Sequence, residues 1–545
     1  MQLSPSAHAD TFCRDSLPPP GQWPDFSFSL PELRYPERVN CAEELLDTTI
    51  KRHGADRPCV LSPSGDWTYG DVLTVASQVA RVLTEDYGIV PGNRVLLRGP
   101  NNPWLVACWL GVIKAGAVTV STMPLLRATE LATIGEIAKP TLALCDHRFT
   151  WDLTTGLPDL PVVPYGGDQP GDLTSLAGQK PGDFASVATA ADDVAMIAFT
   201  SGTTGRPKAT MHFHRDVLAI GDTFSARLLR PTPDDVFTGT PPLAFTYGLG
   251  GLLVFPLRAG ASTLLLEKAA PEELAAQIAE RGVTACSTAP TGYRAMIASG
   301  CAEQLRGLRL AVSAGEHLPA STWQAFYEAT RVPIIDGIGS TEMLHIFISA
   351  AGHDIVPGAT GKAVPGYEAA ILDDEGKPVP DGTIGRLAVK GPTGCRYLAD
   401  DRQRSYVRDG WNLTGDSYLR DADGYFWYQA RVDDIIISAG YNIAGPEIEE
   451  ALLLHPDVAE CGVVGVPDET RGQIVKAYVV LRSGAEGTDA MAARLQEFVK
   501  QQIAPYKYPR AVAFLPALPR TTTGKLQRFR LREAEAPGNP GPLAG

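Results

Sequence analysis

The sequence predicts an α/β protein with a large layered N-terminal domain, residues 1–432, and a small mobile α+β C-terminal domain, residues 433–545. The first observation is length, because 545 residues are too many for one hydrophobic core and favour two or more domains. The second is an alternation of helical periodicity with apolar runs between residues 41 and 146, which is typical of layered α/β domains. The third is a break near residue 430, after which the chain is short enough to form a separate moving unit.

The segments of the large domain fit this prediction in order. Residues 1–40 are rich in proline and are expected to form an irregular arm docked on the domain. The apolar runs at residues 95–97 and 141–144 fit strands within a layered sheet. Residues 165–190 are rich in turn formers, which indicates a surface loop or a subdomain boundary.

Beyond residue 430, short elements of both kinds follow one another. Residues 446–455 and 490–502 are helix-like, whereas residues 461–466 and 475–481 are strand-like. Such a mixture in a short stretch predicts a compact α+β unit.

Composition and charge argue against several classes of protein. Hydrophobic residues make up 44% of the chain and charged residues 20%, as in ordinary soluble globular proteins. The net charge of −14 disfavours a general nucleic-acid binder, which is usually basic. The most apolar stretches, residues 105–121 and 250–266, are interrupted by Lys114 and by Pro256 and Arg258, so we expect no membrane span.

Cysteine usage and the N-terminus predict a cytoplasmic protein. The nine cysteines include no CxxC pair, so we expect reduced thiols rather than a zinc or thioredoxin-like site. The N-terminus has no basic segment followed by an apolar one and does not fit a secretory signal. Small molecules are the expected partners, and a homodimer is the assembly considered.

The motif with the clearest chemistry is the nine-residue segment TSGTTGRPK at residues 200–208. It follows the apolar run at residues 194–199, which reads as a buried strand. Glycine and small hydroxyl residues let the backbone approach phosphate oxygens, and Arg206 and Lys208 add positive charge. The spacing does not match the GxxxxGK[ST] pattern of a Walker loop. The candidate phosphate-binding residues are Thr200, Ser201, Gly202, Thr203, Thr204, Gly205 and Lys208.

This segment closely resembles the phosphate loop of the adenylate-forming enzymes, a superfamily that includes acyl- and aryl-CoA synthetases, peptide-synthetase adenylation domains and luciferases. The resemblance covers nearly the whole chain, and further motifs follow in the expected order. It implies that the protein uses ATP and Mg²⁺ to activate a carboxylic acid as its acyl-AMP and then transfers the acyl group to coenzyme A.

Two further segments resemble the nucleotide site of that superfamily. Residues 336–342, DGIGSTE, resemble an element in which Glu342 would ligate Mg²⁺ and Thr341 would contact the AMP phosphate. One protein carboxylate is chemically sufficient there, because Mg²⁺ is commonly held by one or two carboxylates and the substrate phosphates. Residues 313–319, SAGEHLP, are similar to the adenine-binding turn. The nucleotide-binding candidates in the two segments are Gly315, Glu316, Asp336 and Gly337.

The ribose and hinge elements follow. By the same resemblance, Asp416 of the TGD triplet would hold the ribose hydroxyls and Arg431 would contact AMP. Asp433 would be the pivot between the domains, and Gly440 and Tyr441 would lie on the coenzyme A side.

The chain departs from the common pattern on both sides of the hinge. Ala430 stands where glycine is usual, and Ile437 stands where lysine is frequent. The second departure removes a cation from the region expected to contact coenzyme A.

The end of the chain carries the remaining catalytic candidate. Residues 519–525, PRTTTGK, resemble the terminal element whose lysine, here Lys525, would bridge the carboxylate and the α-phosphate. A positioned cation stabilises the negative charge that develops when a carboxylate attacks phosphorus. Acylation of Lys525 is a regulatory hypothesis, because it would neutralise this cation.

The substrate pocket is predicted from a second set of resemblances. Residues 339–347, GSTEMLHIF, resemble benzoate-CoA ligases, whereas residues 17–24 and 438–447 are more similar to 2-aminobenzoate-CoA ligases. An aromatic wall offers a flat slot for a ring, so an aryl acid is predicted. His345 and Tyr247 are expected to make polar contacts with the carboxylate or an ortho substituent of the acid, and the alternative is that His345 is a histidine of the protein core. The candidate substrate residues are Phe245, Thr246, Tyr247, Gly339, His345 and Ile346.

Other functions stay open at this point. An enzyme with this fold could load the acid onto a separate carrier protein, although no carrier-like segment follows Lys525. It could also act on medium-chain fatty acids. A kinase-like phosphotransferase is disfavoured because the sequence lacks the Walker and protein-kinase motifs. A non-catalytic nucleotide-binding scaffold is disfavoured because it would not need Lys525 together with Glu342, Asp416 and Arg431.

Overall fold

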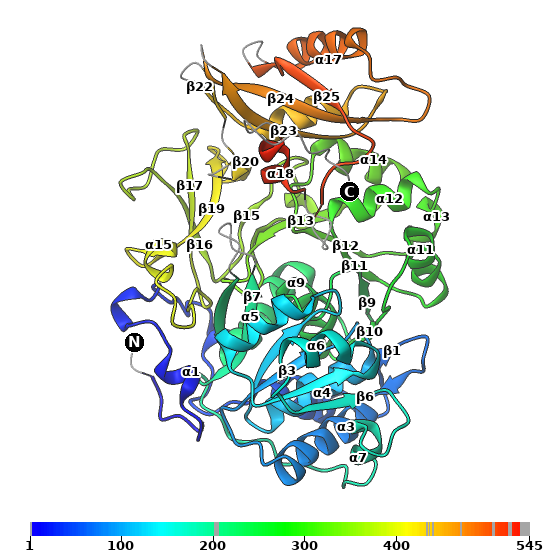
Figure 1. Ribbon diagram of the computed structural model, residues 1–545, viewed down its shortest axis with the longest axis vertical. Coiled ribbons are helices and arrows are strands. Elements are labelled where there is room, and N and C mark those ends of the chain that lie inside the picture. Colours follow the sequence, from blue (N-terminus) through cyan, green and yellow to red (C-terminus); the bar gives the residue numbers. More distant parts are fainter. Residues whose placement is uncertain are drawn as a thin grey trace.

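The fold is α/β, with a large layered N-terminal domain and a small C-terminal domain stacked on one end of it (Figure 1). The computed structural model describes residues 3–200, 207–431, 434, 436–438, 441–468, 471–503, 507–520 and 526–534. The boundary at residues 432 and 433 and the mobility of the small domain stay predictions. No helix among these residues is both long and apolar enough to cross a bilayer.

A six-stranded sheet forms the first layer of the large domain. Its order is β6-β5-β3-β4-β7-β8, and all neighbouring pairs are parallel except β7 with β8. The strands are β3 (Arg94–Arg98), β4 (Val118–Thr122), β5 (Leu142–Asp146), β6 (Val162–Tyr165), β7 (Val194–Thr200) and β8 (Lys208–Phe213). The apolar runs at residues 95–97, 141–144 and 194–199 therefore form strands as predicted.

A nine-stranded sheet forms the second layer, in the order β15-β14-β13-β12-β11-β9-β10-β1-β2. Its central strands are parallel, and β2, β14 and β15 pair antiparallel at the two ends. The strands are β1 (Pro58–Leu61), β2 (Trp67–Thr68), β9 (Val236–Gly239), β10 (Ser262–Leu264), β11 (Ala285–Thr288), β12 (Leu310–Ala314), β13 (Ile334–Gly339), β14 (Ile346–Ser349) and β15 (Lys362–Ala363).

Two antiparallel-rich sheets complete the structure. One lies in the large domain and contains β16 (Glu368–Leu372), β17 (Ile384–Lys390), β18 (Val407–Arg408), β19 (Trp411–Arg420) and β20 (Phe426–Arg431). The other is the sheet of the small domain, with β21 (Ile436–Ser438), β22 (Tyr441–Ile443), β23 (Val458–Asp468), β24 (Gly472–Leu481) and β25 (Ala511–Phe514).

Helices cover the sheets, and their starts follow local sequence. At α3, Asp71 N donates to Thr68 Oγ1 at 3.1 Å and Thr68 N donates to Asp71 Oδ2 at 2.8 Å, which is a capping box. The α-helices of the large domain are α1 (Phe12–Asp15), α2 (Thr48–His53), α3 (Tyr69–Arg81), α4 (Pro103–Lys114), α5 (Ala128–Ala138), α6 (Thr150–Gly156), α7 (Leu173–Ala177), α8 (His214–Ile220), α9 (Thr246–Leu249), α10 (Phe255–Ala259), α11 (Pro271–Glu280), α12 (Pro290–Ala298), α13 (Ala302–Leu305), α14 (Ala320–Thr330) and α15 (Gln403–Tyr406). Those of the small domain are α16 (Gly445–Leu453), α17 (Asp489–Gln502) and α18 (Arg528–Glu533).

Two expectations need adjustment. The turn-rich stretch at residues 165–190 contains the short helix α7, which forms because Asp172 caps it and Leu173 and Ala177 are buried. The proline-rich arm is docked but not wholly irregular, because it contains α1 and its Cys13 is buried.

Candidate active site

Several of the predicted nucleotide residues lie at strand ends or directly after them. In the nine-stranded sheet, β12 pairs with β13, with Ala314 opposite Gly337, so Gly315 and Glu316 follow β12 beside the start of the DGIGSTE segment. Ligands of open α/β sheets usually bind outside the carboxyl ends of their strands. In the six-stranded sheet, Thr200 ends β7 and Lys208 begins β8 in register with it.

An ionic cluster joins the buried Tyr397 and Glu342 to the partly buried Lys208. Tyr397, which is fully buried, donates a hydrogen bond from its hydroxyl to Glu342 Oε1 at 2.6 Å. Lys208 Nζ donates to the same hydroxyl at 3.2 Å. One phenol therefore connects the predicted phosphate-loop lysine to the predicted metal ligand.

Thr341 is held from the other sheet by a histidine. The Nε2–H of His212 donates to the Thr341 carbonyl oxygen at 2.9 Å, which fixes the tautomer of the ring. Burial, followed by the charge of Arg396, lowers the pKa of His212 to about 3. The imidazole is thus a neutral structural donor.

Asp416, predicted to hold the ribose, and Arg431, predicted to contact AMP, are in contact with each other. Arg431 Nη1 donates to Asp416 Oδ1 at 2.9 Å and to the Thr414 carbonyl oxygen at 3.2 Å. Gly415 has a φ of +77°, and a Cβ there would lie 2.8 Å from Arg431 Nη2, so the TGD turn requires glycine. The two side chains meet across the pair β19 and β20, where Asp416 is opposite Arg431.

Asp336 is an unusual carboxyl group at the predicted adenine side. Burial raises its pKa to about 8, and its Oδ1 is buried without a hydrogen bond of normal geometry to the described residues. Nearby, Gly337 packs closely on β14, because a Cβ there would lie 2.7 Å from Ile346 Cγ2.

Glu316 lies 3.5 Å from Arg520 of the small domain.

The predicted substrate residues gather around His345, which is 3% exposed. Its ring centroid lies 4.6 Å from that of Phe255 and 5.6 Å from those of Phe224 and Tyr247. Burial lowers the pKa of His345 to about 3, so its ring is neutral. The Tyr247 hydroxyl donates to the Val312 carbonyl oxygen at 3.1 Å. Both side chains thus belong to an aromatic wall.

Close backbone contacts shape this wall. Gly339 pairs with Ile346, and a Cβ on Gly339 would lie 2.6 Å from the carbonyl oxygen of His345. A Cβ on Gly250 would lie 2.2 Å from His345 Cδ2. Phe245 precedes α9, and Thr246 begins it and is buried.

Several predicted residues lie outside the part of the chain that the structure describes. They are Ser201, Gly202, Thr203, Thr204, Gly205, Asp433, Gly440 and Lys525. For Tyr441 the structure gives the backbone alone, as the first residue of β22.

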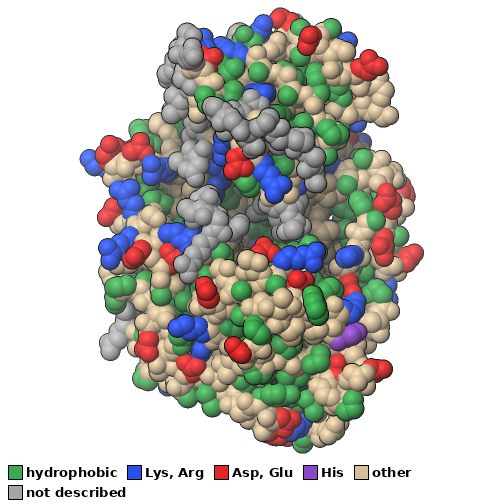
Figure 2. All heavy atoms as spheres, viewed as in Figure 1, with side chains coloured by type: hydrophobic (Ala, Val, Ile, Leu, Met, Phe, Trp, Pro, Cys, Tyr) green, Lys and Arg blue, Asp and Glu red, His purple; other side chains and the backbone are tan. Residues whose placement is uncertain are grey.

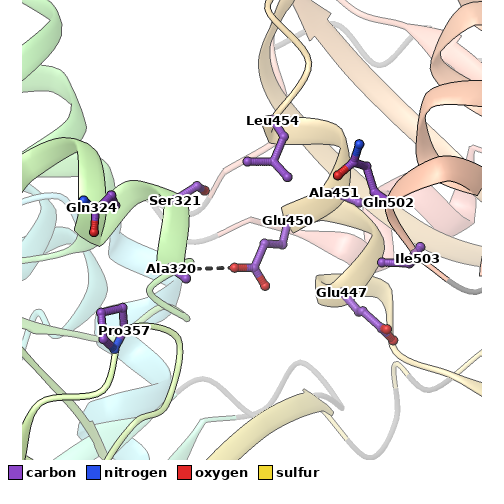
Figure 3. A pocket seen from close by; sticks show the side chains of 10 residues that line it. All are labelled: Ala320, Ser321, Gln324, Pro357, Glu447, Glu450, Ala451, Leu454, Gln502 and Ile503. Carbon is purple, nitrogen blue, oxygen red and sulfur yellow. Dashed lines mark hydrogen bonds between the residues drawn. The ribbon is translucent and has the colours of Figure 1, made fainter.

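The small domain contacts the large one beside the site. Glu450 Oε1 on α16 accepts a hydrogen bond at 3.0 Å from the Ala320 N–H, at the first residue of α14 (Figure 3). A carboxylate is favourable at a helix N-terminus, whose N–H groups lack intrahelical partners. An open cleft of about 450 Å³ surrounds this contact, lined by Ala320, Ser321, Gln324, Pro357, Glu447, Glu450, Ala451, Leu454, Gln502 and Ile503. Figure 2 shows charged side chains of both signs near the junction of the two domains.

Sequence reasoning missed Tyr397 and Glu450. Neither stands in a segment with a recognisable spacing, and a lone tyrosine or glutamate gives no signal by itself. Their contacts become visible when distant segments are brought together, 55 residues apart for Tyr397 and Glu342 and 130 for Glu450 and Ala320.

The residues present are compatible with a magnesium ion held mainly by a nucleotide. Across the described ranges, no group of three or more His, Cys, Asp or Glu side chains could hold a metal on its own. Glu342 Oε2 has no hydrogen bond to the described residues, while Oε1 is held by Tyr397. A single oriented carboxylate suits Mg²⁺, which is commonly completed by substrate phosphates and water.

Comparison with known proteins decides the family. The family described as AMP-binding enzyme matches residues 46–397, and its C-terminal domain matches residues 447–525. The chain belongs to the AMP-binding enzyme family. This confirms the resemblance found in the motifs.

Relatives of this AMP-binding enzyme include several aryl-acid ligases. The chain is 32% identical over 521 residues to benzoate–CoA ligase of Thauera aromatica, covering 94% of this chain and 99% of that protein. It is similar to the structure of the anthranilate CoA ligase AuaEII in complex with anthranoyl-AMP, with a TM-score of 0.88, 33% identity and coverage of 93% and 99%. A benzoate CoA ligase from Burkholderia xenovorans LB400 gives a TM-score of 0.83 with 31% identity, covering 91% of this chain and 100% of that one.

Proposed function

We propose that this AMP-binding enzyme is an ATP-dependent aryl acid:CoA ligase that acts on 2-aminobenzoate or benzoate. The observation that carries the proposal is that residues 339–346 pass from an ionic environment into an aromatic one. Glu342 faces the ionic cluster with Tyr397 and Lys208, whereas His345 lies in the aromatic wall. A flat acid seated on that wall would present its carboxylate toward the phosphate side.

The first half-reaction joins the acid to AMP. The substrate carboxylate attacks the α-phosphorus of ATP and pyrophosphate leaves from the opposite side, so orientation and charge stabilisation supply most of the catalysis. Glu342 would hold Mg²⁺, which neutralises charge on the phosphates. Lys208 and Lys525 would supply fixed cations, Thr341 would contact the AMP phosphate, and Asp416 with Arg431 would hold the ribose side.

The second half-reaction forms the thioester. The thiol of coenzyme A attacks the acyl carbon, the bond to the phosphate oxygen breaks, and AMP leaves. In this proposal the small domain turns about Asp433 between the two steps and presents Gly440 and Tyr441 to coenzyme A. A hinge of a few boundary residues is sufficient for such a motion.

The choice of acid rests on the aromatic wall and on relatives whose names specify benzoate and anthranilate. Burial of aromatic faces around a ring supplies affinity without a charged partner on the ring itself. Transfer to a separate carrier protein and activation of medium-chain acids are the competing functions. A homodimer and a cytoplasmic location stay predictions.

The test is acid-dependent pyrophosphate release from ATP and Mg²⁺ in the presence of coenzyme A. We expect release with 2-aminobenzoate or benzoate, together with the matching CoA thioester by mass spectrometry. Salicylate, 4-hydroxybenzoate and medium-chain fatty acids are the comparison substrates. Release without a thioester would favour a carrier-protein acceptor, and a preference for fatty acids would contradict the assignment of the aromatic wall.

A further inference from the structure

Among the residues that the structure describes, Tyr397 has a hydroxyl that hydrogen-bonds both Lys208 and Glu342. It donates its single proton to Glu342 Oε1 at 2.6 Å and accepts from Lys208 Nζ at 3.2 Å. A phenol is ordinarily protonated at neutral pH, so the proton of this hydroxyl lies toward the carboxylate that accepts it.

The backbone of Tyr397 is attached to the strand that carries Lys208. Leu398 N donates to the Ala209 carbonyl oxygen at 2.9 Å, and Met211 N donates to the Arg396 carbonyl oxygen at 2.8 Å. These bonds fix the tyrosine beside β8 of the six-stranded sheet. Its hydroxyl, in contrast, binds Glu342, which follows β13 of the nine-stranded sheet. Tyr397 thus links the two sheets at the site.

A buried glutamine adds a second anchor. Tyr397 N donates to Gln403 Oε1 at 2.9 Å, and Gln403 Nε2 donates to the carbonyl oxygens of Gln22 at 2.8 Å and Cys395 at 3.1 Å. Gln403 is 1% exposed, so this arrangement is shielded from water. A tyrosine whose backbone is held by β8 on one side and by Gln403 on the other can keep its hydroxyl partner in one orientation.

We propose that Tyr397 is a positioning residue for magnesium-dependent ATP binding, which it serves by holding Glu342 and Lys208 in fixed relative positions. This inference rests on the proposed function, since it takes Glu342 as the metal ligand. The phenol binds Oε1 of Glu342, so Oε2 would be the oxygen that binds the cation. Partners of this kind orient metal-binding carboxylates and commonly change metal affinity when removed.

The variant Tyr397→Phe isolates the hydroxyl. The ring would keep its edge contact with Tyr406, whose centroid is 5.7 Å away, and its place near the Lys208 ammonium. Tyr367→Phe is the matched control, because it removes the same atom from a buried tyrosine that contacts Thr393 Oγ1 at 3.0 Å.

ATP affinity is measured on the full chain by calorimetry, with saturating Mg²⁺ and again with EDTA. We expect Tyr397→Phe to weaken ATP binding about tenfold with Mg²⁺, the size of a lost hydrogen bond to a charged group, and far less with EDTA. The Mg²⁺ concentration that gives half of the binding should rise by a similar factor. Tyr367→Phe should match the wild-type protein in both conditions.

Equal weakening with and without Mg²⁺, or no weakening in either, would overturn the inference. If Tyr397→Phe does not fold, as judged by its thermal transition, Gln403→Leu provides the second test. It keeps the hydroxyl and removes the acceptor of the Tyr397 N–H, so a smaller loss confined to the Mg²⁺ condition is expected and an unchanged protein would count against the inference. The binding experiment contains no acid, so failure of this inference can be distinguished from failure of the proposed function. The proposed function fails if the wild-type protein forms no acyl-AMP.

Discussion

The two ends of residues 339–346 differ in the kind of interaction that surrounds them. At the nucleotide end, Glu342 lies in a chain of charged and polar groups with Tyr397 and Lys208. At the acyl end, His345 lies among Phe255 and other aromatic rings, neutral and 3% exposed. In the proposed function, the end at Glu342 would therefore act on the nucleotide through charge and fixed hydrogen bonds, whereas the end at His345 would act on the acid through shape.

This difference explains why the nucleotide site gave clearer sequence motifs than the acid pocket did. Every enzyme of this chemistry handles the same ATP phosphates, so the residue types near Glu342 are dictated by the reaction. The acid varies, and an apolar wall can be built from many sequences. The same distinction predicts that substitutions at the two ends will affect different kinetic constants.

Glu342→Gln should have the largest effect, because it keeps the shape of the side chain but removes the charge offered to Mg²⁺. We expect acid-dependent pyrophosphate release to fall by about 10²-fold or more, as for other electrostatic catalytic groups. The KM for the acid should change little. Glu368→Gln, at the exposed start of β16, is the control and should behave as wild type. A comparable fall in both variants, or full activity in Glu342→Gln, would contradict this division.

Gly250→Ala should disturb the acyl end alone. Its Cβ would lie 2.2 Å from His345 Cδ2, so the imidazole must move into the aromatic wall. Overpacking of this kind costs about 1–3 kcal/mol, so we expect the KM for the aryl acid to rise roughly 10- to 100-fold while ATP binding is retained. Steady-state kinetics with each substrate varied in turn provides the measurement.

Gly307→Ala is the control for that substitution, because a Cβ at Gly307 meets no atom within 4 Å. It should leave both constants unchanged. If Gly250→Ala instead raised the KM for ATP and left that for the acid unchanged, the aromatic wall would not be the acyl site.

Much of the fold was readable from local sequence. The run at residues 194–199 forms β7, and the helix-like segment at residues 490–502 lies within α17, because apolar periodicity reflects burial directly. The helix α7 was missed, since a five-residue helix in a turn-rich stretch has too few residues to show periodicity.

The candidate site was readable only in part. The resemblance of their motifs to the adenylate-forming superfamily pointed to Glu342, Asp416 and Arg431, and the structure brings the last two into contact at 2.9 Å. Tyr397 was not predicted, because its significance depends on a pairing between two sheets that local sequence does not encode. The catalytic roles themselves stay predictions, including that of Lys525, which lies outside the described residues.

The smallest predicted effect is on the pH dependence of stability. It concerns a feature that the two ends share, a buried neutral histidine. Burial lowers the pKa of His212, beside the nucleotide end, and of His345, at the acyl end, to about 3 in each case. An unfolded histidine titrates near pH 6.5. Below that pH these two histidines bind protons in the unfolded chain but not in the folded chain, so their contribution makes stability fall as pH decreases. Each histidine should lower the folding equilibrium constant by up to about tenfold per pH unit.

His345→Phe isolates the contribution of the acyl end, because it keeps an aromatic ring but removes the titrating group. Urea unfolding between pH 6.5 and 5, above the range where most carboxyl groups titrate, should show a shallower loss of stability in the variant, by about one proton. An unchanged slope would mean that His345 is protonated in the folded protein, and the acyl end would then carry a charge. That result would favour an acid held by an ionic contact, whereas the expected result leaves shape as the property that selects the substrate.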